Sequence, residues 1–193
     1  ENKLDVDLDY LIGLTEVNFD KTDLQLFLKE RIAYYLTEKN YQKNVVKAVV
    51  QQYKLDLLPI LPRVIAEITE FISSESGERV LAVYKRVSNF LGSNKKLLSF
   101  EEKISGDHAT KEDQIVQEQS SLTKEQVEES LQRKDFKTAL FLLGSMVDPV
   151  NQFLDNVQVN CEDNALRSLR YALLNEIRQN MNRVLVFSEL DKK

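Results

Sequence analysis

The chain has 193 residues, of which 42% are hydrophobic and 30% charged, with a formal net charge of −5. This composition is typical of a globular, soluble protein of one domain, or of one domain with an appendage. The single cysteine, Cys161, excludes an internal disulfide and a cysteine-based zinc site, and no apolar run is long enough to cross a bilayer. Because the chain begins at Glu1 and not at Met, we expect it to be a piece of a longer protein.

Apolar residues in the first part of the chain recur every three or four positions, which predicts amphipathic helices. The expected helices cover 3–14, 22–38, 41–53 and 56–73. Thr22 and Gln25 form a capping-box pattern at the start of the second, Asn40 ends it, and a break is expected near Pro62. We assign residues 1–78 to N-terminal helices that pack on a bundle.

The remainder, 79–193, is predicted to form the core of a helical domain. Its expected helices cover 80–91, 124–132 and 135–146, a segment after Pro149, and a long last helix capped by Asp163 or Asn164. Residues 93–122 are polar and hold few large apolar side chains, so we expect a flexible connection there with at most a short helix near 100–104. With no strand pattern, the predicted fold is an all-α bundle of roughly eight helices.

The last helix carries more arginine than its neighbours. Arg167 and Arg178 project to nearly the same side and are candidates for a solvated or ligand-facing role. Arg170 falls inside the apolar arc, where a guanidinium needs a partner. Asp155, Glu162 and Asp163 are within chain reach, and we expect Arg170 to form a structural ion pair with Asp155 or Asp163 that joins the last two helices.

The helix over 80–91 has an apolar side and a basic, acid-free side. Its polar side carries Lys85, Arg86 and Asn89, and Lys95 and Lys96 follow it. Lysine and arginine supply phosphate contacts, and an asparagine amide both donates to and accepts from a base edge. From composition alone, a solvated polar face explains these residues as well as RNA binding does.

Two blocks of this sequence resemble one family. The first is 84–91, and the second comprises 153–157, Glu162-Asp163, Leu166-Arg167, Arg170, Leu173-Leu174 and Phe187-Ser188. Both resemble the C-terminal region of the beta subunit of bacterial glycyl-tRNA synthetase. That region is similar to the helical anticodon-binding domain of arginyl-tRNA synthetase.

The resemblance implies a function and partners. It implies binding of the anticodon stem and loop of glycine tRNA in the cytoplasm, with the alpha subunit and the rest of the beta subunit as partners in a heterotetramer. It also implies that ATP and Mg²⁺ act on the alpha subunit, so no cofactor is expected in this chain. Neither DNA nor a membrane is an expected partner.

The sequence also yields a hypothesis about the binding surface and leaves an alternative open. The polar side of 80–91 and the Arg167–Arg178 side of the last helix would form one concave RNA-binding surface. No catalytic or metal site is expected, because no glycine-rich phosphate loop, paired histidine motif or nucleophile–base pair is present. The alternative function, suited to the acidic net charge, is a helical protein–protein interaction or assembly module.

Overall fold

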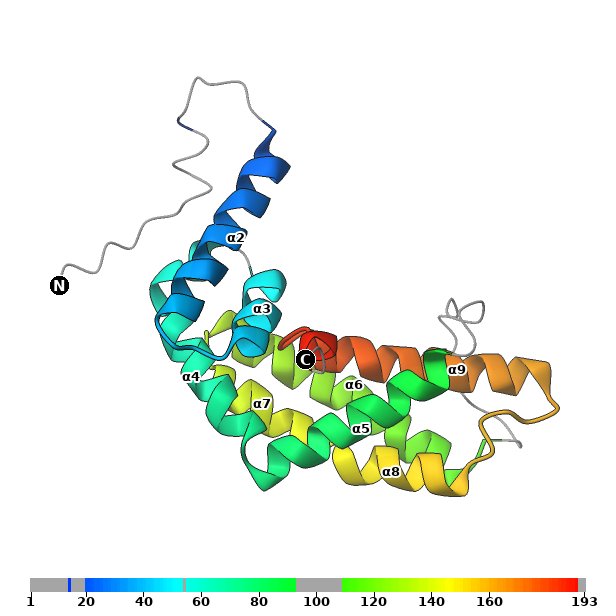
Figure 1. Cartoon of the computed structure of the whole chain (residues 1–193). Helices are drawn as coiled ribbons and strands as arrows, with labels where there is room; N and C mark the ends of the chain where they lie inside the picture. Colours follow the sequence, from blue (N-terminus) through cyan, green and yellow to red (C-terminus); the bar gives the residue numbers. More distant parts are fainter. Residues whose placement is uncertain (1–13, 15–19, 54, 93–108, 191–193) are drawn as a thin grey trace. The chain divides into compact units, whose positions relative to one another are not determined.

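The computed structural model describes residue 14 and residues 20–53, 55–92 and 109–190. Every regular element within these ranges is a helix, and no strand occurs in them, which confirms the all-α prediction (Figure 1). The helix predicted over 3–14, apart from Leu14, lies outside the described residues, as do Lys95 and Lys96.

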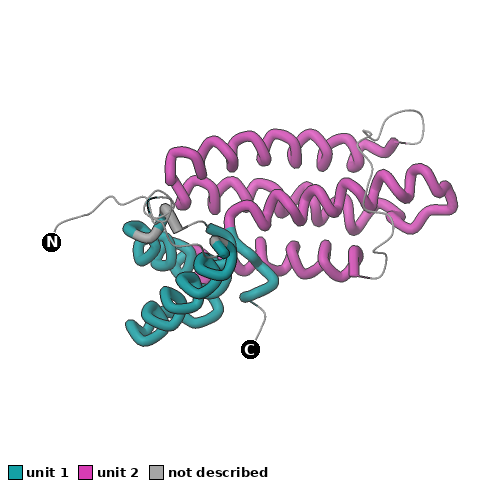
Figure 2. Tube along the Cα trace, turned by 90° about the horizontal axis from the view of Figure 1, so that it is seen from above, with its two compact units in different colours: residues 1–70, 185–193 teal, residues 71–184 magenta. Residues whose placement is uncertain are grey.

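The chain divides into two compact units (Figure 2). Unit 1 comprises Glu1–Glu70 and Leu185–Lys193, and unit 2 comprises Phe71–Val184. This division differs from the predicted one, which placed the boundary after residue 78 and kept the C-terminus with the core. The physical reason is a set of contacts between the C-terminal segment and one N-terminal helix, described next.

Unit 1 contains α2 (Lys21–Glu38), α3 (Lys43–Gln52), a 3-10 helix η1 (Leu55–Ile60), most of α4 (Leu61–Ile72) and the 3-10 helix η2 (Phe187–Glu189). The N–H of Val186 donates to the carbonyl of Ala48 at 3.5 Å. Nearby, Lys47 Nζ pairs with Glu189 Oε2 at 3.0 Å. These bonds tie the end of the chain to α3.

The turns in unit 1 follow local rules. Asn40 ends α2 with a φ of 66°, as predicted for a left-handed stop. The cap of α2 is Asp20 and not Thr22, because the Asp20 carboxylate accepts the Thr22 N–H at 2.8 Å. Pro62 lies in the first turn of α4, and the expected break is the junction of η1 and α4.

Unit 2 is a bundle of α5 (Glu75–Gly92), α6 (Lys111–Gln132), α7 (Phe136–Gly144), α8 (Val147–Asn156) and α9 (Asn164–Asn182). Its core holds large side chains from all five helices, among them Val87, Val116, Phe136, Phe153 and Leu174. Gly77 permits the close turn into α5, since an added Cβ would lie 2.0 Å from the carbonyl oxygen of Phe71. A side chain at residue 77 would therefore force the backbone to move.

The long helix α6 corrects the part of the predicted connection that covers 111–122, whereas 93–108, with the short helix expected near 100–104, lie outside the described residues. It begins after Thr110 and runs without a break to Gln132, whereas the sequence pattern predicted a helix from 124 onward. Thr110 and Asp113 form a reciprocal capping box that fixes this start. In the first half of α6 about one residue per turn is buried, namely Asp113, Val116 and Ser120. Two of these three inward residues, Asp113 and Ser120, are polar. Apolar periodicity therefore missed this half of the helix.

Candidate functional site

The predicted basic face of α5 separates into two groups. Lys85 and Asn89 are exposed and lie one helical turn apart, opposite the buried Val83 and Val87. Arg86 instead turns toward α8, where its guanidinium donates to Asn151 Oδ1 and Asp155 Oδ1, each at 2.5 Å. Of these three residues, Lys85 and Asn89 thus lie at the exposed surface of α5.

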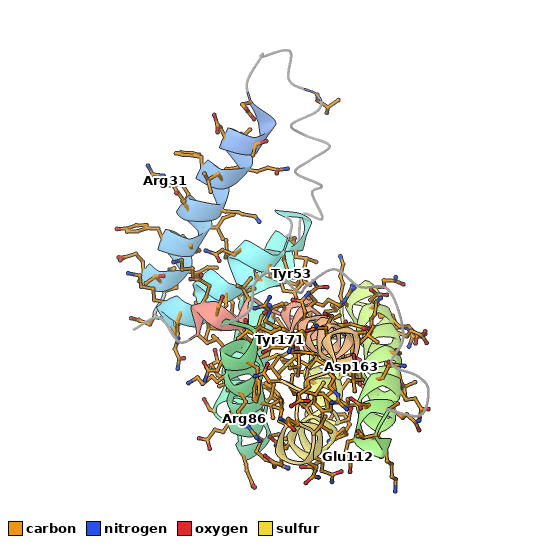
Figure 3. All side chains as sticks on the ribbon, turned by 90° about the vertical axis from the view of Figure 1, so that its right-hand side faces the viewer. Arg31, Tyr53, Arg86, Glu112, Asp163 and Tyr171 are labelled. Carbon is orange, nitrogen blue, oxygen red and sulfur yellow. The ribbon has the colours of Figure 1, made fainter. Side chains whose placement is uncertain are left out.

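Ion pairs join α5 and α8 along their length. Besides the Arg86 contacts, Arg79 pairs with Asp148 one to two turns nearer the start of both helices. Partners that advance together in both helices show that α5 and α8 run parallel. Arg86, labelled in Figure 3, is therefore part of the bundle's structure as well as a candidate for RNA contact.

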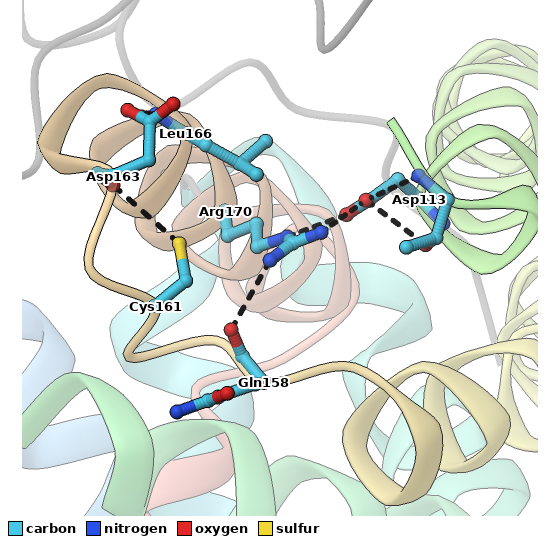
Figure 4. Close-up of polar contacts among 7 residues, drawn as sticks. Asp113, Gln158, Cys161, Asp163, Leu166 and Arg170 are labelled. Atoms are coloured by element: carbon cyan, nitrogen blue, oxygen red, sulfur yellow. Dashed lines mark hydrogen bonds and ion pairs between the residues drawn. The ribbon is translucent and has the colours of Figure 1, made fainter. Parts of the chain in front are cut away.

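Arg170 is buried and paired, as expected, but with a different partner. Its Nε and Nη2 donate to the two carboxylate oxygens of Asp113 on α6, at 3.0 Å and 2.6 Å. Its Nη1 donates to the carbonyl of Gln158 at 3.1 Å (Figure 4). Arg170 and Asp113 are 4% and 0% exposed, which makes this the buried clamp of unit 2.

The predicted partners of Arg170 have other roles. Asp155 binds Arg86, and Asp163 caps α9 by accepting the N–H groups of Ala165 and Leu166 at 2.8 Å and 3.1 Å. The prediction of Asp155 or Asp163 as the partner is therefore wrong. Asp113 was missed because it lies in the segment assigned to the polar connection, although the Thr110–Asp113 spacing was a readable capping signal.

Electrostatics keep both members of the clamp charged. Burial alone raises the pKa of Asp113, but the hydrogen bonds from Arg170 and Thr110 outweigh burial and lower that pKa below its ordinary 3.8. Hydrogen bonding to Asp113 raises the pKa of Arg170 against the opposing effect of burial. The pair joins α9, the start of α6 and the α8–α9 loop at one end of the bundle.

Two further polar contacts continue along α6 and α9. Asn180 Nδ2 donates to Ser120 Oγ at 2.9 Å, and Arg183 pairs with Glu128. The partners again advance together, so α6 and α9 run parallel. Sequence reasoning found neither contact, because a lone asparagine and serine in helices give no local signal of pairing.

The two arginines predicted to face a ligand on α9 are half-buried. Arg167 donates to the carbonyl of Cys161 at 3.0 Å and to Asn164, while Arg178 donates to Asn175 at 2.9 Å. The printed partners of both arginines therefore lie on α9 itself or in the loop that precedes it. A joint surface with Lys85 and Asn89 stays a prediction.

Two absences apply to the described ranges only. No helix there is both long and apolar enough to cross a membrane. Likewise, the described histidine, cysteine, aspartate and glutamate side chains form no group of three or more that is placed to hold a metal ion.

Comparison with known protein families decides what this bundle is. Residues 80–187 match the family described as the DALR anticodon binding domain. The chain belongs to this family. The matched range begins in α5, ends at η2, and includes Lys85, Arg86, Asn89, Arg167, Arg170 and Arg178.

Curated relatives extend the likeness beyond the DALR domain. The chain is 32% identical over 179 residues, 92% of its length, to the glycine–tRNA ligase beta subunit of Ralstonia nicotianae. It is 30% identical over 201 residues, 98% of its length, to the same subunit of Rickettsia akari. It spans 25% and 28% of these two relatives, about a quarter of their length. The predicted resemblance to the beta subunit family is confirmed.

Proposed function

We propose that this chain binds the anticodon stem and loop of glycine tRNA and thereby supports glycyl-tRNA synthesis. The observation that carries the proposal is the match of 80–187 to an anticodon-binding domain. The beta-subunit name of the relatives supports glycine as the amino acid. Within this proposal the protein acts in the cytoplasm beside the alpha subunit and the rest of the beta subunit, with ATP and Mg²⁺ used on the alpha subunit.

Two exposed residues of α5, Lys85 and Asn89, are placed to contact the tRNA in this proposal. Lys85 would neutralise a backbone phosphate, and Asn89, one turn away, would hydrogen-bond to an unpaired base. Lysine contacts to phosphate supply affinity without sequence choice, whereas base-edge contacts distinguish one loop from another. The two substitutions therefore have different expected effects.

The test is binding of the chain to glycine tRNA at two salt concentrations, beside the same tRNA with a changed anticodon. Affinity should fall with salt and with the changed anticodon. Lys85→Ala should lower the slope of log affinity against log salt by about 0.7 to 0.9, the value for one phosphate contact. Lys43→Ala, which alters an exposed lysine on α3, is the charge-matched control. Asn89→Ala should instead reduce the difference in affinity between the native tRNA and the tRNA with the changed anticodon. Binding that ignores both salt and anticodon would refute the proposal.

One observation favours the second candidate, a protein-interaction role, for unit 1. Helix α2 carries four large apolar side chains that are at least half exposed: Leu26, Phe27, Tyr34 and Tyr35. Its only buried residue among those described is Leu36, and a helix that is apolar on several sides is typical of an element covered by a partner. Calorimetric titration with the remainder of a beta subunit, supplied as a separate chain, tests this role. Loss of the binding heat in the double variant Phe27→Ser with Tyr34→Ser would support this role. An unchanged binding heat would exclude this face of α2 as the contact.

A further inference from the structure

The loop over 157–163, which joins α8 to α9, alternates at its start between buried and exposed side chains. Val157 and Val159 are 7% and 2% exposed, whereas Gln158 and Asn160 are exposed. Burial of the two valines fixes this part of the loop to the core of unit 2. The two amide side chains are thereby held at the surface of the same unit.

Arginines of α9 also hold the backbone of this loop. Arg170 Nη1 donates to the carbonyl of Gln158 at 3.1 Å, as Figure 4 shows. Arg167 Nη1 donates to the carbonyl of Cys161 at 3.0 Å. Since Asp113 fixes Arg170 in turn, the loop is bonded to the buried clamp and has little freedom to move.

The exposed amides combine a fixed position with unused hydrogen-bonding groups. The hydroxyl of Tyr171, a residue that is 1% exposed, donates to Asn160 Oδ1 at 2.8 Å and so orients this side chain from below. Within the described ranges, neither Asn160 Nδ2 nor the side-chain amide of Gln158 has a hydrogen-bond partner. An amide both donates and accepts, as a base edge requires, and a group that is already ordered loses less entropy on binding.

The charges around the loop fit a base better than a phosphate. Residues 155–165 contain no lysine or arginine. Asp155 pairs with Arg86, which also places the start of the loop beside α5, and Asp163 caps α9. The exposed Glu162 would repel a phosphate, but it can accept a hydrogen bond from a base amino group.

The composition of the loop argues against a protein partner. A protein-binding hot spot packs large apolar or aromatic side chains together. The exposed residues of 155–165 are amides, acids and one alanine, Ala165. This set offers hydrogen bonds without apolar area, which suits the recognition of an unpaired base.

We propose that Gln158 and Asn160 read the edges of unpaired bases in the anticodon loop of the bound tRNA, with Tyr171 as the positioning residue for Asn160. This inference rests on the proposed function and adds specificity-determining residues to the contacts of Lys85 and Asn89. Because amides carry no charge, they would change which tRNA is preferred without changing how binding depends on salt.

The first experiment measures the affinity of the chain for glycine tRNA and for the same tRNA with a changed anticodon. Gln158→Ala and Asn160→Ala should each lower the ratio of the two affinities about five- to tenfold and leave the salt slope unchanged. Tyr171→Phe should lower the ratio by a smaller factor, since the amide of Asn160 remains but is no longer held. Gln132→Ala, at an exposed glutamine at the end of α6, is the matched control and should change neither quantity. The melting temperature of each variant verifies folding.

The second experiment locates the loop on the RNA. Asn156→p-benzoylphenylalanine places a photo-crosslinker at an exposed residue beside the two amides, and irradiation should join it to a nucleotide of the anticodon loop. The same amino acid at Gln132 should give no crosslink to that loop.

The outcomes separate this inference from the proposed function. If the unaltered chain prefers the native anticodon but both amide variants keep that preference, or if the crosslink lies outside the anticodon loop, the reading role is refuted and the proposed function stands. If the unaltered chain binds neither tRNA, both fail.

Discussion

Replacing Arg170 by alanine would leave the carboxylate of Asp113 buried without its counter-charge. Arg170 supplies two of the hydrogen bonds to this carboxylate, and Asp113 is 0% exposed, so water cannot take its place without a rearrangement. The loss also frees the carbonyl of Gln158. We therefore expect Arg170→Ala to destabilise unit 2 strongly.

The size of the effect follows from the burial of the pair. Removing one partner of a buried ion pair costs about 3 to 5 kcal/mol of stability. Thr110 keeps its hydrogen bonds to Asp113 in the variant, so we expect a loss near the lower end of this range. At about 2 to 4 °C per kcal/mol for a chain of this length, about 3 kcal/mol lowers the melting temperature by about 6 to 12 °C.

Thermal and urea unfolding, followed by circular dichroism, measure this loss. Arg133→Ala is the matched control, since it removes an arginine whose partner, Glu129, is also exposed, and it should cost less than about 1 kcal/mol. A loss for Arg170→Ala no larger than that for Arg133→Ala would refute the reasoning that Asp113 is desolvated and depends on this arginine.

Three further predictions concern unit 2. The pKa of Asp113 lies below 3.8 in the folded protein, so its charged form stabilises the fold fully above about pH 3.8. This stabilisation is lost as the pH falls through the pKa of the folded state. In unfolding curves, Asp113→Asn should therefore make the free energy of unfolding depend less on pH in the acid range. Gly77→Ala should lower the melting temperature by several degrees, as the new Cβ collides with the Phe71 backbone, whereas Gly144→Ala, at an open position, should not. Asp163→Ala should cost about 1 kcal/mol as α9 loses its cap, and Asp163→Asn should restore most of it; equal losses in the two would contradict a capping role.

Much of the fold was readable from local patterns. Apolar residues at three- and four-residue steps predicted α2, α3 and α9, and the caps at Asn40 and Asp163 lie where turn and capping chemistry placed them. These features depend on residues within about one turn of each other, so the sequence contains their whole cause. The blocks around residues 84–91 and 153–188 likewise indicated the family.

Other features depended on residues far apart in the chain. The first half of α6 was missed because its inward side is partly polar, and what stabilises that side, Arg170 and Asn180, lies 57 and 60 residues away. The same reason applies to Arg86, whose partner Asp155 is 69 residues distant.

The sequence by itself determined the helical class, most helix ends and the family of this protein. Only the tertiary structure decided which arginines are held by carboxylates and which side chains, Lys85 and Gln158 among them, are exposed. A guanidinium is drawn to whichever carboxylate the packing brings within hydrogen-bonding distance, and helical periodicity gives the side on which a residue lies but not the helix it meets.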